Sequence, residues 1–328
     1  MLALPDDELI AALAGRRRPG IERELCRLDV GALRARASVA GLGLICRCDP
    51  AYPAQLRSLD APPAVLHVAG SLERALALLE RDSVAIVGAR RASGYGLDVA
   101  RSLARGLATA GLTVISGMAL GIDSAAHAGT LAAHGATVAV LPGGADRPYP
   151  ASRRPLYRRI VATGTILSEL PAGAAVRRWA PPARNRLIAA LAAVTVVVEA
   201  GARSGALVTA SYARELGHPV GAVPGRVTSD LAAGCNGLIR SGAALIRRPQ
   251  DVLDELFGEG VVTYREAVRP PLREELERLL CAVGKGHDTI AALGQSGFSP
   301  EQALAGISEL ELCGYVRRGP GGRFSVVP

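Results

Sequence analysis

The middle of the sequence alternates short apolar segments with longer helical patterns. The apolar segments span residues 84–88, 113–116, 137–141, 165–168, 194–199 and 219–223. Helical patterns fall between them, near residues 95–110, 122–134, 152–162, 185–193 and 206–216. Parallel strands need a crossover of about this length, so the alternation predicts βαβ units. We therefore expect an α/β fold in which a parallel sheet carries helices on both faces.

The chain on either side of this alternation predicts two smaller parts. Residues 1–48 contain short helical patterns, and the four prolines of residues 49–70 indicate a linker with little regular structure. After a second linker at 265–271, three amphipathic helices and two short strands are expected, an order that looks like a winged helix. The predicted domains are an N-terminal helical region at 1–48, a Rossmann-like domain at 49–264 and a winged-helix domain at 271–328.

Basic charge is concentrated in one part of the sequence. The chain has 38 basic and 30 acidic residues, and its net charge is +8. Nine arginines from Arg147 to Arg186 face one acid, Glu169, so this block alone also holds +8. An anionic polymer is the natural partner of such a block, although a solvated face that binds nothing would have the same composition.

The remaining composition excludes several classes of protein. No apolar stretch reaches 18 residues, and the first ten residues are acidic where a signal peptide is basic, so we expect a cytoplasmic protein without a membrane span. Of six cysteines only Cys46 and Cys48 are close in sequence, which favours reduced thiols over a metal site. The only lysine, Lys285, stands in no P-loop pattern, so we expect neither P-loop ATP hydrolysis nor a bound cofactor.

Small residues follow nearly every predicted strand, at the edge where parallel sheets bind their ligands. Glycine lets a ligand approach the backbone, and N–H groups at helix N-termini attract phosphate. The spacing of the glycines after the first strand does not fit a dinucleotide, whereas phosphates beside an arginine block indicate a nucleic-acid backbone. The candidate contacts of this kind are Gly88, Ser116, Gly117, Gly143, Gly144, Ser204, Gly205 and Thr209.

Seven motifs resemble, in order, those of the DprA/Smf family of DNA-processing proteins. They lie at residues 83–96, 116–127, 141–150, 168–169, 184–188, 199–209 and 224–225. The resemblance implies a non-enzymatic, homodimeric protein that binds single-stranded DNA, protects incoming DNA and loads the RecA recombinase during natural transformation. It implies RecA and single-strand-binding protein as partners, and a dimer interface around residues 238–246.

The resemblance also assigns DNA contacts to individual residues. They fall on Arg90, Ser116, Gly117, Arg178, Arg184, Asn185 and Arg186. Structural roles are the alternatives: Arg90 would pair with an acid, Asn185 would cap the helix at 185–193, and Arg178 would be solvated. The family usually has an aromatic residue where this chain has Pro181, so Trp179 is the candidate for stacking on a base.

Two other functions remain open from the sequence. The first is hydrolysis of nucleotides by a Rossmann-like phosphoribohydrolase, but the Gly-Thr and glutamate of that signature are missing after Gly144. Asp123 and His127 would then be an acid–base pair, although an internal pair that holds two loops is the preferred interpretation. Glu169 and Glu199 are expected to orient loop N–H groups. The second function is a nucleotide sensor, which predicts tighter binding of a mononucleotide than of a single-stranded oligonucleotide.

Overall fold

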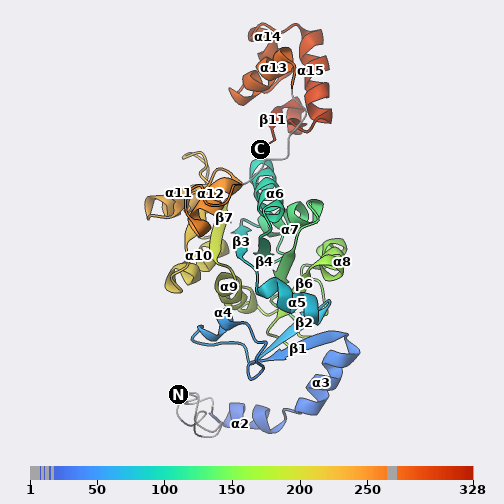
Figure 1. The fold of residues 1–328 in the computed structure, drawn as a ribbon, viewed down its shortest axis with the longest axis vertical. Helices are drawn as coiled ribbons and strands as arrows, with labels where there is room; N and C mark the ends of the chain where they lie inside the picture. The colour runs from blue at the N-terminus through green and yellow to red at the C-terminus, as the bar shows by residue number, and fades with distance from the viewer. Residues whose placement is uncertain (1–7, 9–10, 12–14, 16–17, 264–271, 328) are drawn as a thin grey trace.

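Strands and helices alternate through the middle of the chain as the sequence predicts. The computed structural model describes residues 8, 11, 15, 18–263 and 272–327. Its large sheet has the order β1-β2-β6-β5-β4-β3-β7-β8-β9 (Figure 1). The parallel strands are β3 Ser83–Gly88, β4 Thr113–Ser116, β5 Thr137–Val140, β6 Thr165–Ser168, β7 Val194–Val198, β8 Val220–Ala222 and β9 Ala244–Leu245. All of them therefore end at one edge of the sheet.

The two faces of the sheet bury alternate residues of the same strands. In β3, Val84 and Ile86 join the core beneath α6, α7 and α12, while Ala85 and Val87 join the core beneath α5, α9 and α10. Burial on both faces explains why these strands are almost purely apolar. The helices are α5 Leu72–Leu79, α6 Gly94–Thr109, α7 Ile122–Ala132, α8 Arg154–Thr163, α9 Ala180–Leu191, α10 Gly205–Glu215, α11 Ala233–Arg240 and α12 Pro249–Phe257.

The strand order reverses between β3 and β7. Successive crossovers move outward from β3 to β4, β5 and β6, and the chain then returns to place β7 on the other side of β3. The loops after β3 and β7 consequently leave in opposite directions, which opens a crevice at this switch point. Ligands of open parallel sheets usually bind at such a crevice.

The prediction that residues 49–70 form a linker with little regular structure is wrong. This segment contains α4 (Ala54–Arg57) and β2 (Val65–Ala69), which pairs antiparallel with β6 and with β1 (Leu42–Cys46). Tertiary pairing overrides the proline-rich composition, because the prolines lie outside β2 and leave its N–H groups free for the ladder. Before β1 lie the expected helices, α2 (Arg18–Cys26) and α3 (Val30–Val39).

The helix expected at 185–193 begins earlier in the structure. α9 starts at Ala180, and Pro181 and Pro182 occupy its first turn. Prolines are tolerated there because the first N–H groups of a helix have no intrahelical partner. Their breaker character therefore suggested a helix start that is five residues too late.

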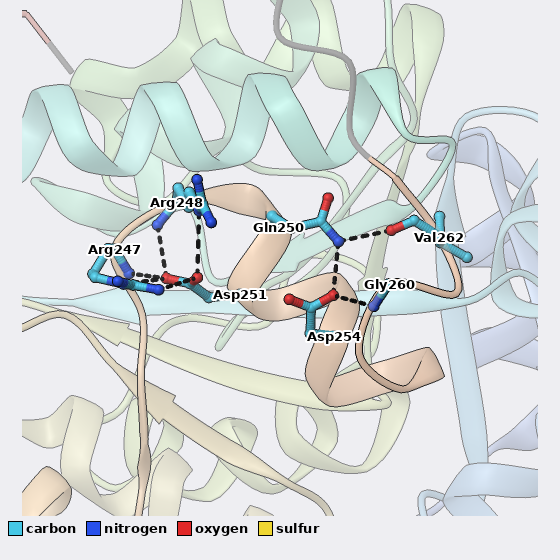
Figure 2. A network of polar contacts seen from close by, with 7 residues as sticks. All are labelled: Arg247, Arg248, Gln250, Asp251, Asp254, Gly260 and Val262. Carbon is cyan, nitrogen blue, oxygen red and sulfur yellow. Dashed lines mark hydrogen bonds and ion pairs between the residues drawn. The ribbon is translucent and has the colours of Figure 1, made fainter.

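Polar contacts fix α12 at both ends, beside α6 (Figure 2). The carboxylate of Asp251 accepts hydrogen bonds from the backbone N–H groups of Arg247 and Arg248, at 2.7 and 3.3 Å. At the other end, Asp254 accepts from the Gln250 side chain at 2.7 Å and from the Gly260 N–H at 3.2 Å. The Asp251 contacts satisfy backbone N–H groups at the start of the helix, and the Asp254 contacts hold the loop that follows it.

The C-terminal module has a core of its own. It contains α13 Glu274–Gly284, α14 Ile290–Gln295, α15 Pro300–Leu312, β10 Val316–Arg318 and β11 Phe324–Val326. An ion pair of 2.8 Å joins Arg317 of this module to Asp98 on α6. The elements agree with the expected order of three helices and a hairpin. The winged-helix assignment stays a prediction, and the linker at 265–271 lies outside the described residues.

Among the described helices, none has the length and apolarity to cross a bilayer.

Candidate functional site

The crevice at the strand-order reversal is a cavity of about 480 Å³, here called the switch pocket. Its walls come from the loop after β3, the first half of α9 and the N-terminal turns of α10. Half of the residues predicted from the sequence line it: Gly88, Arg90, Arg184, Asn185, Ser204, Gly205 and Thr209. The others lie elsewhere and are described below.

Arg90 and Arg91 supply the accessible positive charge of the switch pocket. Both side chains are exposed, and neither makes an ion pair or side-chain hydrogen bond with any residue that the structure describes. The structural alternative for Arg90, an acidic partner, is therefore not realised within the described chain. Unpaired guanidinium groups at a pocket mouth are available for phosphate oxygens.

The N-terminus of α10 forms the opposite wall. Ser204 caps this helix by accepting a hydrogen bond of 3.3 Å from the Ala206 N–H, and Gly205 has no atom within 4 Å of the place where a β-carbon would stand. Open space beside helix N–H groups suits an anion. The expectation that Asn185 caps its helix is wrong, because Asn185 lies within α9. Its side chain donates to the Gly205 carbonyl oxygen at 3.1 Å and so connects α9 to α10.

Arg184 lines the pocket but is itself buried, with 4% of its surface exposed. Its guanidinium group donates to the Val140 carbonyl oxygen and lies where a β-carbon on Gly117 would stand. Burial lowers the pKa of Arg184 to about 10, although the nearby Asp123 opposes that shift. Gly117 is thus required by an arginine that packs against it, a contact the sequence pattern attributed to DNA.

Asp123 and His127 form neither the acid–base pair nor the internal pair considered above, because each has other partners. Asp123 accepts hydrogen bonds from the N–H groups of Gly117 and Ala119, at 3.1 and 3.4 Å, and burial raises its pKa. The Nδ1 of His127 lies 2.7 Å from the hydroxyl of Thr137, which itself donates to a carbonyl oxygen, so Nδ1 carries the proton. Burial lowers the pKa of His127 to about 3. Asp123 alone holds the loop after β4.

The ends of β4 and β5 use their small residues for packing. The hydroxyl of Ser116 is buried and donates to the Ile86 carbonyl oxygen at 2.6 Å. Gly143 lies against Val176, and the Gly144 N–H donates to the Ala174 carbonyl oxygen at 3.0 Å. These residues admit a neighbouring loop, not open space.

Arg186 is paired with an acid instead of facing the pocket. Its guanidinium group binds Glu169 through two hydrogen bonds, of 2.5 and 3.1 Å, and also reaches the Ala61 carbonyl oxygen at 3.1 Å. Glu169 therefore neutralises an arginine, which corrects its expected role. Glu199 has the role expected of it, because it accepts hydrogen bonds from the N–H and hydroxyl groups of Ser93.

Two predicted contacts are exposed but outside the pocket. Trp179 is 58% exposed at the start of α9, and Arg178 precedes it. The sequence analysis missed Arg91, whose position next to Arg90 was an available signal. It also missed Leu231, which the loop after β8 brings to the pocket and which no local pattern marks.

Comparisons with known proteins agree on one family. Residues 43–257 match the model of the family described as DNA recombination-mediator protein A. A DprA protein of Mycobacterium tuberculosis is 45% identical over 242 residues; the alignment covers 71% of this chain and 61% of that protein, so the chain spans less than two thirds of that relative. Protein Smf of Synechocystis is 33% identical, with 84% of this chain and 78% of that protein covered.

Two solved structures are also similar. DNA processing protein A of Streptococcus pneumoniae superposes with a TM-score of 0.70 at 33% identity, covering 77% of this chain and 87% of that one. The Helicobacter pylori protein, whose single-stranded DNA binding mode has been described, superposes with a TM-score of 0.59 at 29% identity, covering 66% and 97%. The recurrent sheet and the matching family model lead to one conclusion: this chain belongs to the DNA recombination-mediator protein A family, the group that includes DprA and Smf.

Proposed function

We propose that the protein binds single-stranded DNA at the switch pocket and takes part in DNA processing during natural transformation. The observation that carries this proposal is the pair of unpartnered arginines, Arg90 and Arg91, which line the same cavity of about 480 Å³ as the open N-terminus of α10. Guanidinium groups and helix N–H groups both favour phosphate oxygens. The single-stranded DNA binding of the Helicobacter pylori relative supports the same ligand.

The carboxylate in the pocket wall does not oppose an anion strongly. Asp123 is the only acidic residue among the described residues that line the switch pocket, and two backbone N–H groups already bind its carboxylate. The buried Arg184 adds positive potential behind it. The electrostatic field at the pocket mouth is consequently set by Arg90 and Arg91.

The proposed partners and compartment follow from family membership. We propose a cytoplasmic homodimer that protects incoming DNA and loads RecA, with single-strand-binding protein as a further partner. Support for the dimer surface comes from β9, which is an edge strand of the sheet and carries Leu245 with 45% of its surface exposed. An apolar side chain on an unpaired edge is suited to association with a second chain.

We also propose that the protein is not an enzyme. The residues considered as an acid–base pair are each engaged elsewhere, Asp123 by backbone N–H groups and His127 by Thr137. Release of a nucleobase from nucleoside monophosphates is the assay that would contradict this part of the proposal.

The test is a binding titration with single-stranded and duplex oligonucleotides at two salt concentrations. The double variant Arg90→Ala/Arg91→Ala is expected to bind the single strand about tenfold or more weakly, and its salt slope should fall by about 0.7 for each phosphate that it no longer neutralises. Arg81→Ala/Arg105→Ala is the matched control, since both of these arginines are exposed and neither lines the switch pocket. Equally weakened binding by the two variants, or tighter binding of a mononucleotide than of a 20-mer, would overturn the proposal.

A further inference from the structure

A second basic cavity lies on the other face of the sheet, between α6, α7 and α8. It has a volume of about 330 Å³, and Arg101, Arg153 and Arg159 supply its charged groups. None of the described residues that line it is acidic. We propose that this α8 pocket binds a backbone phosphate of the same DNA strand that occupies the switch pocket; the inference rests on the proposed function and extends its binding track.

Arg153 is built into the α8 pocket with an unused donor. Its Nε atom is buried and has no hydrogen-bond partner in the described structure. A buried N–H without an acceptor is unfavourable, and a hydrogen bond to a ligand oxygen would remove that penalty. The side chain of Arg159, which follows on α8, is also without an ionic or hydrogen-bond partner among the described residues.

Arg101 completes the charged wall from α6. It pairs with Asp98 at 2.9 Å, and Asp98 also binds Arg317 of the C-terminal module at 2.8 Å. One carboxylate is thus shared by two guanidinium groups, which leaves a surplus of positive charge beside the cavity. The exposed Ser152 adds a hydroxyl to the lining, and the hydroxyl of Ser124, which also lines it, already donates to the Ala119 carbonyl oxygen; Leu97 and Leu156 are among the apolar lining residues.

The two pockets share a wall. Gly121 lines the α8 pocket, and a β-carbon on it would overlap the carbonyl oxygen of Ala89, a residue of the switch pocket. The Ile122 N–H donates to the same Ala89 oxygen at 3.2 Å. The Gly121 wall of the α8 pocket is therefore in direct contact with the loop after β3, which lines the switch pocket. A strand that leaves Arg90 over this loop reaches the mouth of the α8 pocket next.

The chemistry of the α8 pocket selects phosphate over base. Three guanidinium groups and the Ser152 hydroxyl can donate hydrogen bonds to a ligand, while the described lining residues include no aromatic side chain and no carboxylate. Phosphate contacts position a nucleic acid without reading its sequence. The expected contribution is therefore affinity that grows with strand length and does not depend on base composition.

The experiment compares two oligothymidylates with two double variants of the full chain. Strands of about 6 and about 20 nucleotides bracket the site sizes common among single-strand binders. Arg153→Ala/Arg159→Ala removes two of the three pocket charges and leaves Arg101, whereas Arg154→Ala/Arg158→Ala removes two exposed arginines of α8 that do not line the cavity. Arg153→Lys/Arg159→Lys keeps the charge, and thermal unfolding of each variant reports its folding.

The proposal expects a selective loss. Arg153→Ala/Arg159→Ala should bind the long strand about tenfold more weakly with the short strand unaffected, and its salt slope for the long strand should fall by about 0.7 for each phosphate that leaves the pocket. The lysine variant should recover much of this affinity. An equal loss in the control variant would overturn the proposal by showing a diffuse effect of charge, and so would an unchanged affinity for the long strand. A loss at the α8 pocket without any loss in Arg90→Ala/Arg91→Ala would instead contradict the proposed function at the switch pocket.

Discussion

The two halves of the ligand-binding edge use the same kinds of residue for opposite purposes. After β7, Gly205 borders open space at the mouth of the switch pocket, whereas Gly88 at the end of β3 packs against the Val198 carbonyl oxygen. At the end of β4, Arg184 packs against Gly117, and after β5 the loop that follows β6 packs against Gly144. We call these halves the switch side and the packed side.

The difference teaches what a glycine after a strand can indicate. It shows that something approaches the backbone closely, but the approaching group can be a ligand or another part of the chain. The strand order alone does not decide between them: the reversal between β3 and β7 places the switch pocket here, but Gly88 at the same point packs against Val198. The predictions below separate the two sides by measurement.

The largest effect is expected from a methyl group on the packed side. Gly117→Ala would displace the buried guanidinium group of Arg184 and is expected to lower the free energy of unfolding by about 3 kcal/mol. Gly205→Ala has open space around it and should change stability by less than about 0.5 kcal/mol while weakening single-strand binding. Chemical denaturation and a DNA titration measure both quantities. Equal destabilisation by the two variants would remove the distinction between the sides.

A smaller loss is expected where Arg186 meets Glu169. Arg186→Ala leaves a partly buried carboxylate unpaired, so the free energy of unfolding should fall by about 2 kcal/mol, a value discounted for side chains that are 18% and 19% exposed. Adding Glu169→Ala to this variant should restore part of the lost free energy of unfolding, because the unpaired carboxylate is then removed. If the folded Arg186→Ala protein bound DNA tenfold more weakly, Arg186 would belong to the interface instead.

The smallest effect concerns pH. His127 has its pKa lowered from 6.5 to about 3 by burial, so the folded state needs the neutral ring. Above pH 6.5 the ring is neutral in both states, and the full stability is present. As the pH falls from 6.5 toward 3, the unfolded chain takes up a proton that the folded chain does not, so the free energy of unfolding decreases. Between about pH 7 and about pH 5.5 the wild type should lose about 1 kcal/mol more than His127→Gln. Parallel pH dependences in urea unfolding would show that His127 does not titrate in this way.

The sequence predicts the parallel sheet well, because its strands are apolar runs of fixed spacing and its turns are marked by small residues. It fails at β2, where the proline-rich composition concealed a strand that pairing with β1 and β6 stabilises. Arg90 and the start of α10, which it names as DNA contacts, line the switch pocket, and their contact with DNA stays a prediction. The sequence does not reveal that Arg184 is buried or that Arg186 pairs with Glu169, since burial and an acid 17 residues away leave no local trace.

The contact between Arg186 and the Ala61 carbonyl oxygen links parts of the chain that are made at different times during synthesis. Its partners lie 125 residues apart, and Glu169 meets them at the same guanidinium group. The segment before β2 therefore stabilises the position of α9, the helix that carries Asn185 into the switch pocket. A chain shortened from its N-terminus to the first parallel strand would keep every wall of that pocket and yet hold one of them less firmly.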